Sequence, residues 1–253
     1  GSKKKKMVVR RLSEVVVVLA AARALAKNEE EEPILIYNRV PKAGSSYLVS
    51  VLQALAKQNN FRVVSDETFW DRDSMLRTLK TLKPGDVYSS HQHFVPDVGR
   101  PAVWMNMLRE PLARDNSLFY YGVDYRNQGE HALAELDRRK ADPQCGCAGL
   151  EYETCVIQRD EQGCYDRILC NPQEDAFVEY DNQTHHTPMD LVFKTIIDNY
   201  AAVGITAEMD LSIALFEKVL PRWFEGASTL NASLTGHRAT NIENDLTPGT
   251  HLN

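Results

Sequence analysis

Residues 33–46 read PILIYNRVPKAGSS, and they decide the fold because an apolar run passes there into a short loop and then a helical pattern. The run Pro33–Tyr37 is short, apolar and β-prone, which predicts a buried strand. From Tyr47 apolar residues recur at helical spacing, so Ser45 or Ser46 is the expected N-cap of a helix. Backbone N–H groups of the loop, together with the helix N-terminus, can surround an anion. The segment therefore predicts a strand, an anion-binding loop and a helix in succession.

This loop is not a Walker A loop, because the glycine spacing G-x-x-x-x-G-K is absent. The order of strand, PKxGSS and helix instead resembles the 5′-phosphosulfate loop of sulfotransferases that use 3′-phosphoadenosine 5′-phosphosulfate (PAPS). That resemblance implies that the cofactor binds at Lys42, Ala43, Gly44, Ser45 and Ser46. For this segment alone, an ordinary strand–turn–helix with an incidental lysine is the alternative.

A second segment has the same organisation. The apolar run Val103–Leu108 predicts a strand, and Pro111 fits the first turn of a helix that follows it. Sulfotransferases carry the pattern R-[DE]-P-x-x-R-x-x-S here, and its first arginine and its serine bind the 3′-phosphate of the cofactor. The resemblance assigns these roles to Arg109 and Ser117. A guanidinium fork and a hydroxyl suit a dianionic phosphate.

Longer strings narrow the resemblance to the uronosyl 2-O-sulfotransferases, which modify heparan, dermatan and chondroitin sulfates. The string YNRVPK at 37–42 is close to the loop of that family, and the resemblance covers roughly residues 33–240. Other matching pieces follow in the family's order, at Lys83–Gly85, Asp124–Arg126, Val203–Thr206 and Leu220–Ala227. The resemblance implies transfer of a sulfuryl group from PAPS to the 2-O position of a uronic acid in a glycosaminoglycan-type glycan. The product would be adenosine 3′,5′-bisphosphate, and no metal would take part.

The same resemblance suggests which residues act in the reaction. The acceptor hydroxyl must lose a proton, and histidine is the usual base near neutral pH. His91 and His93 follow an expected strand at 86–90, where the family places its catalytic histidine. Aligning Tyr88-Ser89-Ser90-His91 with that segment favours His91 as the base and His93 as a substrate contact. For either histidine alone, an ordinary surface-loop residue is the alternative.

Four basic residues receive roles in binding and charge stabilisation. Lys42 is expected to stabilise the charge that builds on the bridging oxygen of the leaving phosphate. Arg39 and Arg126 are candidates for the carboxylate or neighbouring sulfates of the sugar, because guanidinium forks suit planar carboxylates. For Arg126 a solvent-facing loop residue is the alternative. Arg238 lies in Thr235–Thr240, which resembles the family's loop over the nucleotide.

Composition and periodicity favour one α/β domain at residues 33–253, built as a parallel sheet flanked by helices. The whole chain is 43% apolar, which supports a sizeable core, and the chain's net charge of −6 requires any polyanion site to be locally basic. No nucleic-acid partner is expected. The remaining elements are expected as strands at 61–64, 86–90 and 202–205 and as helices at 73–82, 130–140, 189–200 and 209–220.

Two regions flank or interrupt this pattern. Residues 1–32 combine a basic block, an apolar run at 15–22 and an acidic linker; the run is too short to span a bilayer, so a helix is favoured over the remnant of a signal-anchor. An insertion at about residues 142–182 holds all five cysteines, for which disulfides are favoured over zinc. Cys155 and Cys164 resemble a disulfide of the family. The family also implies a Golgi-lumenal, type II membrane protein that forms homo-oligomers (trimers), and the sequons at Asn182 and Asn231 agree with that compartment.

Three functions remain open from the sequence. The first is a PAPS-dependent glycan 2-O-sulfotransferase. The second is a catalytically weak, sulfotransferase-like binding protein, because the basic cluster that follows Arg126 in the family is replaced here by Asn127–Glu130. The third is a P-loop nucleotide phosphotransferase, which predicts a set of Mg²⁺ ligands and a Walker lysine that the sequence does not show.

Overall fold

The computed structural model describes residues 31–66, 71–114, 116–117, 176–179 and 189–230. The chain divides into two compact units, one formed by residues 1–108 and 173–253 and the other by residues 109–172. The sheet and its helices belong to the first unit.

The first unit is built on five parallel strands in the order β2-β3-β1-β4-β5. The strands are β1 (Ile34–Asn38), β2 (Val63–Asp66), β3 (Val87–Ser90), β4 (Ala102–Leu108) and β5 (Tyr200–Ile205). Every residue of the central strand β1 is buried, which explains its continuous apolar sequence. The predicted parallel sheet is confirmed.

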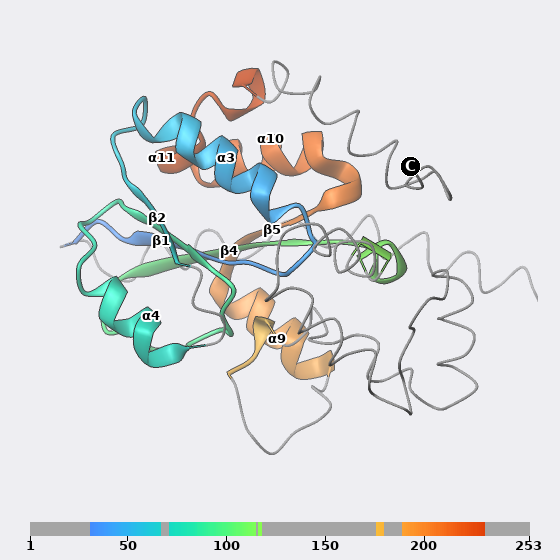
Figure 1. Cartoon of the computed structure of the whole chain (residues 1–253), viewed down its shortest axis with the longest axis horizontal. Helices are drawn as coiled ribbons and strands as arrows, with labels where there is room; N and C mark the ends of the chain where they lie inside the picture. Colours follow the sequence, from blue (N-terminus) through green and yellow to red (C-terminus); the bar gives the residue numbers. More distant parts are fainter. Residues whose placement is uncertain (1–30, 67–70, 115, 118–175, 180–188, 231–253) are drawn as a thin grey trace, which may run out of the picture. The chain divides into compact units, whose positions relative to one another are not determined.

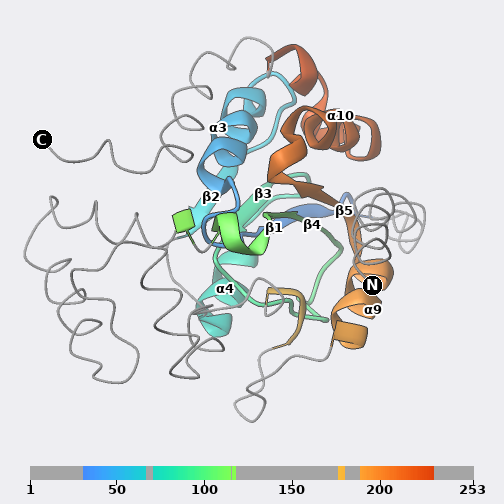
Figure 2. The same cartoon turned by 90° about the vertical axis from the view of Figure 1, so that its right-hand side faces the viewer.

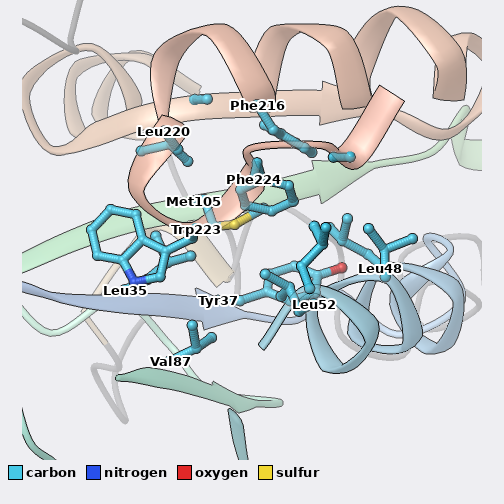
Figure 3. Packing of buried hydrophobic residues seen from close by; sticks show 14 of the residues in the cluster. Leu35, Tyr37, Leu48, Leu52, Val87, Met105, Phe216, Leu220, Trp223 and Phe224 are labelled. Atoms are coloured by element: carbon cyan, nitrogen blue, oxygen red, sulfur yellow. The ribbon is translucent and has the colours of Figure 1, made fainter. Parts of the chain in front are cut away.

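Helices cover both faces of this sheet (Figures 1 and 2). On one face lie α3 (Ser45–Ala56), α10 (Met209–Val219) and the short α11 (Pro221–Phe224), and on the other lie α4 (Arg72–Leu79) and α9 (Met189–Asn199). A single 3₁₀ turn, η3 (Thr206–Glu208), joins β5 to α10. The side chains of one buried cluster, including Tyr37, Leu48, Phe216 and Trp223, fill the space between the sheet and α3, α10 and α11 (Figure 3). A second buried cluster lies on the other face, so the sheet has a separate hydrophobic core on each side.

Several element boundaries differ from the prediction. The expected N-cap at Ser45 or Ser46 was wrong, because Gly44 takes that position with a left-handed φ of 78° and α3 begins at Ser45. The strand expected at 61–64 begins at Val63 instead. Pro221 does not simply end the preceding helix; it starts α11, since proline fits the first helical position.

Some expectations lie outside the described residues. They are the helix at 130–140, all five cysteines of the insertion, the N-terminal apolar run and both sequons; of the insertion itself the structure describes residues 176–179. Across the described part of the chain, no helix combines the length and the apolar character that crossing a membrane requires.

A buried polar network joins three strands and the segment at 176–179. Asn38 on β1 donates from Nδ2 to the hydroxyl of Tyr200 on β5 (2.8 Å) and to the backbone oxygen of Ala176 (2.6 Å). Asn106 on β4 donates to Asn38 Oδ1 (3.0 Å) and to its backbone oxygen (2.7 Å). Burial raises the pKa of the Tyr200 hydroxyl above its usual value, so this group stays protonated. The network fixes the carboxyl-terminal ends of β1 and β4 relative to each other.

Two buried tyrosines offer a matched test of this network. Removing the hydroxyl in Tyr200→Phe is expected to lower the free energy of unfolding by about 1–3 kcal/mol, because Asn38 loses a buried partner. The same change at Tyr37 is expected to cost less than about 0.5 kcal/mol, because its hydroxyl has no hydrogen-bond partner among the described residues. Urea unfolding of both variants measures the difference, and equal losses would contradict the network's importance.

Candidate active site

The predicted anion-binding loop connects β1 to α3. The Ala43 N–H donates to the Val40 backbone oxygen (3.4 Å), and the Leu48 N–H donates to that of Gly44 (3.2 Å), which starts the helix. Among the described residues no side chain caps this start. Because the first N–H groups of a helix have no partner within it, the N–H groups of Ser45 and Ser46 can bind an anion here.

Lys42 has a backbone conformation that is costly for its residue type. Its φ is 64°, in the left-handed region, and Asn60 is the other non-glycine residue of the described chain with positive φ. Asparagine adopts this region readily, whereas for lysine it costs about 1–2 kcal/mol. Such strain collects at functional sites, where the surrounding structure maintains it. The conformation of Lys42 therefore supports a role for the loop beyond connecting two elements.

Gly44 has little space around its Cα. A Cβ added there would lie 3.1 Å from Met209 Cε and 3.5 Å from Thr206 Cγ2, and its φ of 78° disfavours any side chain. The loop is thus packed tightly against the segment that follows β5.

Gly44→Ala is expected to destabilise the fold by about 1–2 kcal/mol and to weaken anion binding by the loop. Gly99→Ala is the matched control, because Gly99 has a similar φ of 72° and no atom within 4 Å of an added Cβ. The control should lose similar stability and keep its affinity for adenosine 3′,5′-bisphosphate. Calorimetric titration of both variants tests this; equal affinities would show that the packing around Gly44 does not shape the loop.

The loop after β3 carries both candidate histidines. His91 is buried, and its Nδ1 lies 2.9 Å from the backbone oxygen of Arg39. Because that oxygen can only accept, Nδ1 carries a hydrogen, and in the neutral imidazole Nε2 is then the acceptor, which is the form that a general base needs. His93, two residues further on, is half-buried. The Arg39 N–H also donates to the Ser90 backbone oxygen (2.7 Å), so the loops after β1 and β3 are joined.

The side chain of Arg39 lies among the ends of the neighbouring strands. It is 6% exposed, and its Nη2 donates to the backbone oxygen of Asp66 at the end of β2 (3.3 Å). The Asp66 carboxylate in turn accepts a hydrogen bond from the Tyr88 hydroxyl (3.2 Å). Arg39 therefore joins the ends of β1 and β2, and its assignment to the sugar stays a prediction.

The second unit begins with Arg109, directly after β4. Pro111 is the first residue of a helical turn, as predicted, and Glu110 Oε2 accepts a hydrogen bond from the Ala113 N–H (2.7 Å) at its start. Arg109 and Ser117 are half-buried, and Arg114 is buried. The roles of Arg109 and Ser117 stay predictions, and Arg126 and Arg238 lie outside the described residues.

The described residues hold no group of three His, Cys, Asp or Glu side chains arranged to bind a metal ion. The candidate residues Lys42 to Ser46, His91 and Arg109 all follow the carboxyl ends of parallel strands. In open α/β sheets ligands bind beyond these ends.

Sequence reasoning missed the network of Asn38, Asn106 and Tyr200 and a contact of Thr206 with the loop. Polar Asn38 and Asn106 in otherwise apolar strands were the signal for the network. Thr206 was noted only as part of a matching string, and its hydroxyl lies 3.0 Å from the backbone oxygen of Ala43.

No protein-family model matches the chain. Heparan sulfate 2-O-sulfotransferase 1 from Mus musculus and from Homo sapiens are each 26% identical to it over 221 residues, which is 78% of this chain and 57% of each relative. Uronyl 2-sulfotransferase from Mus musculus is 21% identical over 215 residues, 78% of this chain and 50% of the relative. The chain thus spans between half and three fifths of the relatives' length. Its five-stranded parallel sheet with flanking helices is consistent with the sulfotransferase fold, and the chain is a homologue of heparan sulfate 2-O-sulfotransferase and uronyl 2-sulfotransferase.

Proposed function

We propose that this protein is a PAPS-dependent sulfotransferase that transfers a sulfuryl group to the 2-O position of a uronic acid in a glycosaminoglycan-type glycan. The observation that carries the proposal is the β1–α3 loop. It combines a helix start at which no side chain of the described residues caps the backbone with a lysine of left-handed φ after the carboxyl end of a central strand. The homology to two 2-O-sulfotransferases supports the reaction type.

In this proposal the chain binds the cofactor at two places. The backbone N–H groups and side chains of Lys42 to Ser46 hold the 5′-phosphosulfate, since α3 presents donors and a positive dipole end there. Arg109 and Ser117 hold the 3′-phosphate, and Arg238 contributes a further nucleotide contact. PAPS supplies the activated sulfuryl group, while the protein binds and orients it.

The protein also handles the acceptor's proton and the charge on the leaving group. His91 takes the proton at Nε2, because its Nδ1 is committed to the backbone oxygen of Arg39. His93, more exposed in the same loop, contacts the substrate and is the alternative base. The Lys42 ammonium stabilises the charge that develops on the bridging oxygen of the phosphate. No metal ion is needed for these steps.

The acceptor is a polyanion, although the chain carries a net charge of −6. Binding therefore depends on local positive charge, for which Arg39 and Arg126 are proposed together with His93. A uronic acid offers a planar carboxylate that suits a guanidinium fork. The sequence resemblance further leads us to propose a Golgi-lumenal, type II membrane protein that forms a homo-oligomer and has no nucleic-acid partner.

Calorimetry with adenosine 3′,5′-bisphosphate in EDTA tests this function. Binding with chelator present is the expected result, because the proposed contacts are side chains and backbone N–H groups. Binding that requires Mg²⁺ would favour a nucleotide phosphotransferase and contradict the proposal. Chelator-resistant binding without transfer to any uronic-acid glycan would identify a sulfotransferase-like binding protein instead.

A further inference from the structure

Thr206 lies between two backbone segments that belong to the proposed site. Its Oγ1 is 3.0 Å from the backbone oxygen of Ala43, in the β1–α3 loop. The same atom is 2.9 Å from the backbone oxygen of Leu108, the last residue of β4. Both oxygens can only accept, so the hydroxyl donates to them, and its single hydrogen is shared between the two.

The methyl group of Thr206 also faces this loop. A Cβ on Gly44 would lie 3.5 Å from Thr206 Cγ2 and 3.6 Å from its Oγ1. Thr206 therefore supports the loop through packing and through a hydrogen bond. Ala43 and Gly44 lie directly between Lys42 and the start of α3, so a shift there moves both proposed anion-binding elements.

The residues before Thr206, at the end of β5, are bonded to α10. The Ile205 N–H donates to Ser212 Oγ (2.8 Å), and Ser212 Oγ donates to the Ile205 backbone oxygen (3.1 Å), which joins the end of β5 to α10. A Cβ on Gly204 would lie 2.7 Å from Phe216 and 2.8 Å from Ser212, so α10 approaches β5 closely there. Thr206 thus follows a strand end that is hydrogen-bonded to α10 and closely packed against it.

We infer that Thr206 is a positioning residue that holds the β1–α3 loop against the end of β4. The inference rests on the proposed function, in which that loop binds the phosphosulfate and Arg109 follows β4. Small misplacement of a binding loop has large effects on rate, about a hundredfold for 1 Å. The Thr206 hydroxyl contacts the backbone of Ala43, next to Lys42, and that of Leu108, the residue before Arg109. In this inference one hydroxyl therefore holds the backbone beside each of the two proposed phosphate-binding residues.

The test compares Thr206→Val, which keeps the shape and removes the hydroxyl, with Thr206→Ser, which keeps the hydroxyl. Thr81→Val is the matched control, because Thr81 Oγ1 also donates to a backbone oxygen, that of Thr78 (2.8 Å), on the turn after α4. Hydrogen exchange of amides in residues 40–47 of the ligand-free protein reports the loop. Calorimetry reports the affinity for adenosine 3′,5′-bisphosphate.

Thr206→Val is expected to speed amide exchange in the loop about tenfold and to weaken nucleotide binding about tenfold, the scale of one lost buried hydrogen bond. Thr206→Ser and Thr81→Val should stay within about twofold of wild type on both measures. In a turnover assay Thr206→Val should lower kcat/KM, and Thr206→Ser should restore it.

Unchanged loop exchange in folded Thr206→Val would overturn the inference, even if its melting temperature fell. Equal loss in Thr206→Ser would also overturn it, since packing rather than the hydroxyl would then hold the loop. If Thr206→Val does not fold, Thr206→Ala makes the same comparison with a smaller side chain. If wild type binds no nucleotide, the proposed function fails, and the exchange measurement still decides whether Thr206 holds the loop.

Discussion

Replacing His91 by alanine is expected to lower turnover at saturating PAPS by about 10²–10⁴-fold, the usual scale for loss of a general base. The reason is geometric. The Nδ1 of His91 donates to the Arg39 backbone oxygen, so in the neutral imidazole Nε2 is the acceptor for the substrate's proton. Affinity for adenosine 3′,5′-bisphosphate should stay near that of wild type, because His91 is proposed to contact the acceptor and not the nucleotide.

His93→Ala is the matched comparison, and it is expected to lose less activity, since a neighbouring histidine only orients the substrate. A nearly normal His91→Ala beside an inactive His93→Ala would move the base two residues along the loop. Normal turnover in both variants would exclude proton transfer through this loop. Nucleotide affinity, measured for each variant, shows whether the loop after β1 has been disturbed through the Arg39 contact.

Removing the charge of Lys42 is expected to affect both binding and turnover. Lys42→Ala should weaken nucleotide binding by about 1.5–3 kcal/mol, the range for hydrogen bonds to charged groups. Turnover should fall by a further factor of about 10²–10³, as for the loss of one group that stabilises developing charge. Calorimetry and initial rates at saturating PAPS separate the two losses.

Two controls accompany this variant. Lys57→Ala removes an exposed lysine just after α3 and should leave binding and turnover unchanged. Lys42→Gly removes the same charge but suits the left-handed φ of 64°, so it should be no less stable than Lys42→Ala and equally inactive. Full activity in Lys42→Gly would show that binding and turnover depend on the backbone conformation at position 42 and not on the ammonium group.

Those parts of the fold that depend on the local pattern of apolar and polar residues could be predicted from the sequence. An apolar run of strand length, followed by small residues and a helical repeat, identified β1, its loop and α3, and the alternation of strands and helices identified the parallel sheet. The position of the candidate residues beyond the strand ends followed from that topology. Element ends were less accurate, because the cap of α3 depends on the backbone angle of Gly44 and not on a serine side chain.

Contacts between distant segments could not be predicted in this way. Thr206 is 163 residues from Ala43, and Tyr200 is 162 residues from Asn38, so no local pattern joins them. The direction of the Arg39 side chain also could not be predicted from the sequence. The sequence shows a guanidinium next to an anion-binding loop, whereas the fold directs it to the backbone at the end of β2.

The most direct test of the proposed function is transfer of a labelled sulfuryl group from PAPS to a desulfated, uronic-acid-containing glycan. The reaction is run in EDTA, and the product is cleaved to disaccharides that show which hydroxyl carries the sulfate. The proposed mechanism predicts label at the 2-O position of the uronic acid, with the transfer lost in Lys42→Ala. A folded protein that transfers no label to any member of a glycan panel, or that acts only as a Mg²⁺-dependent phosphotransferase, would contradict it.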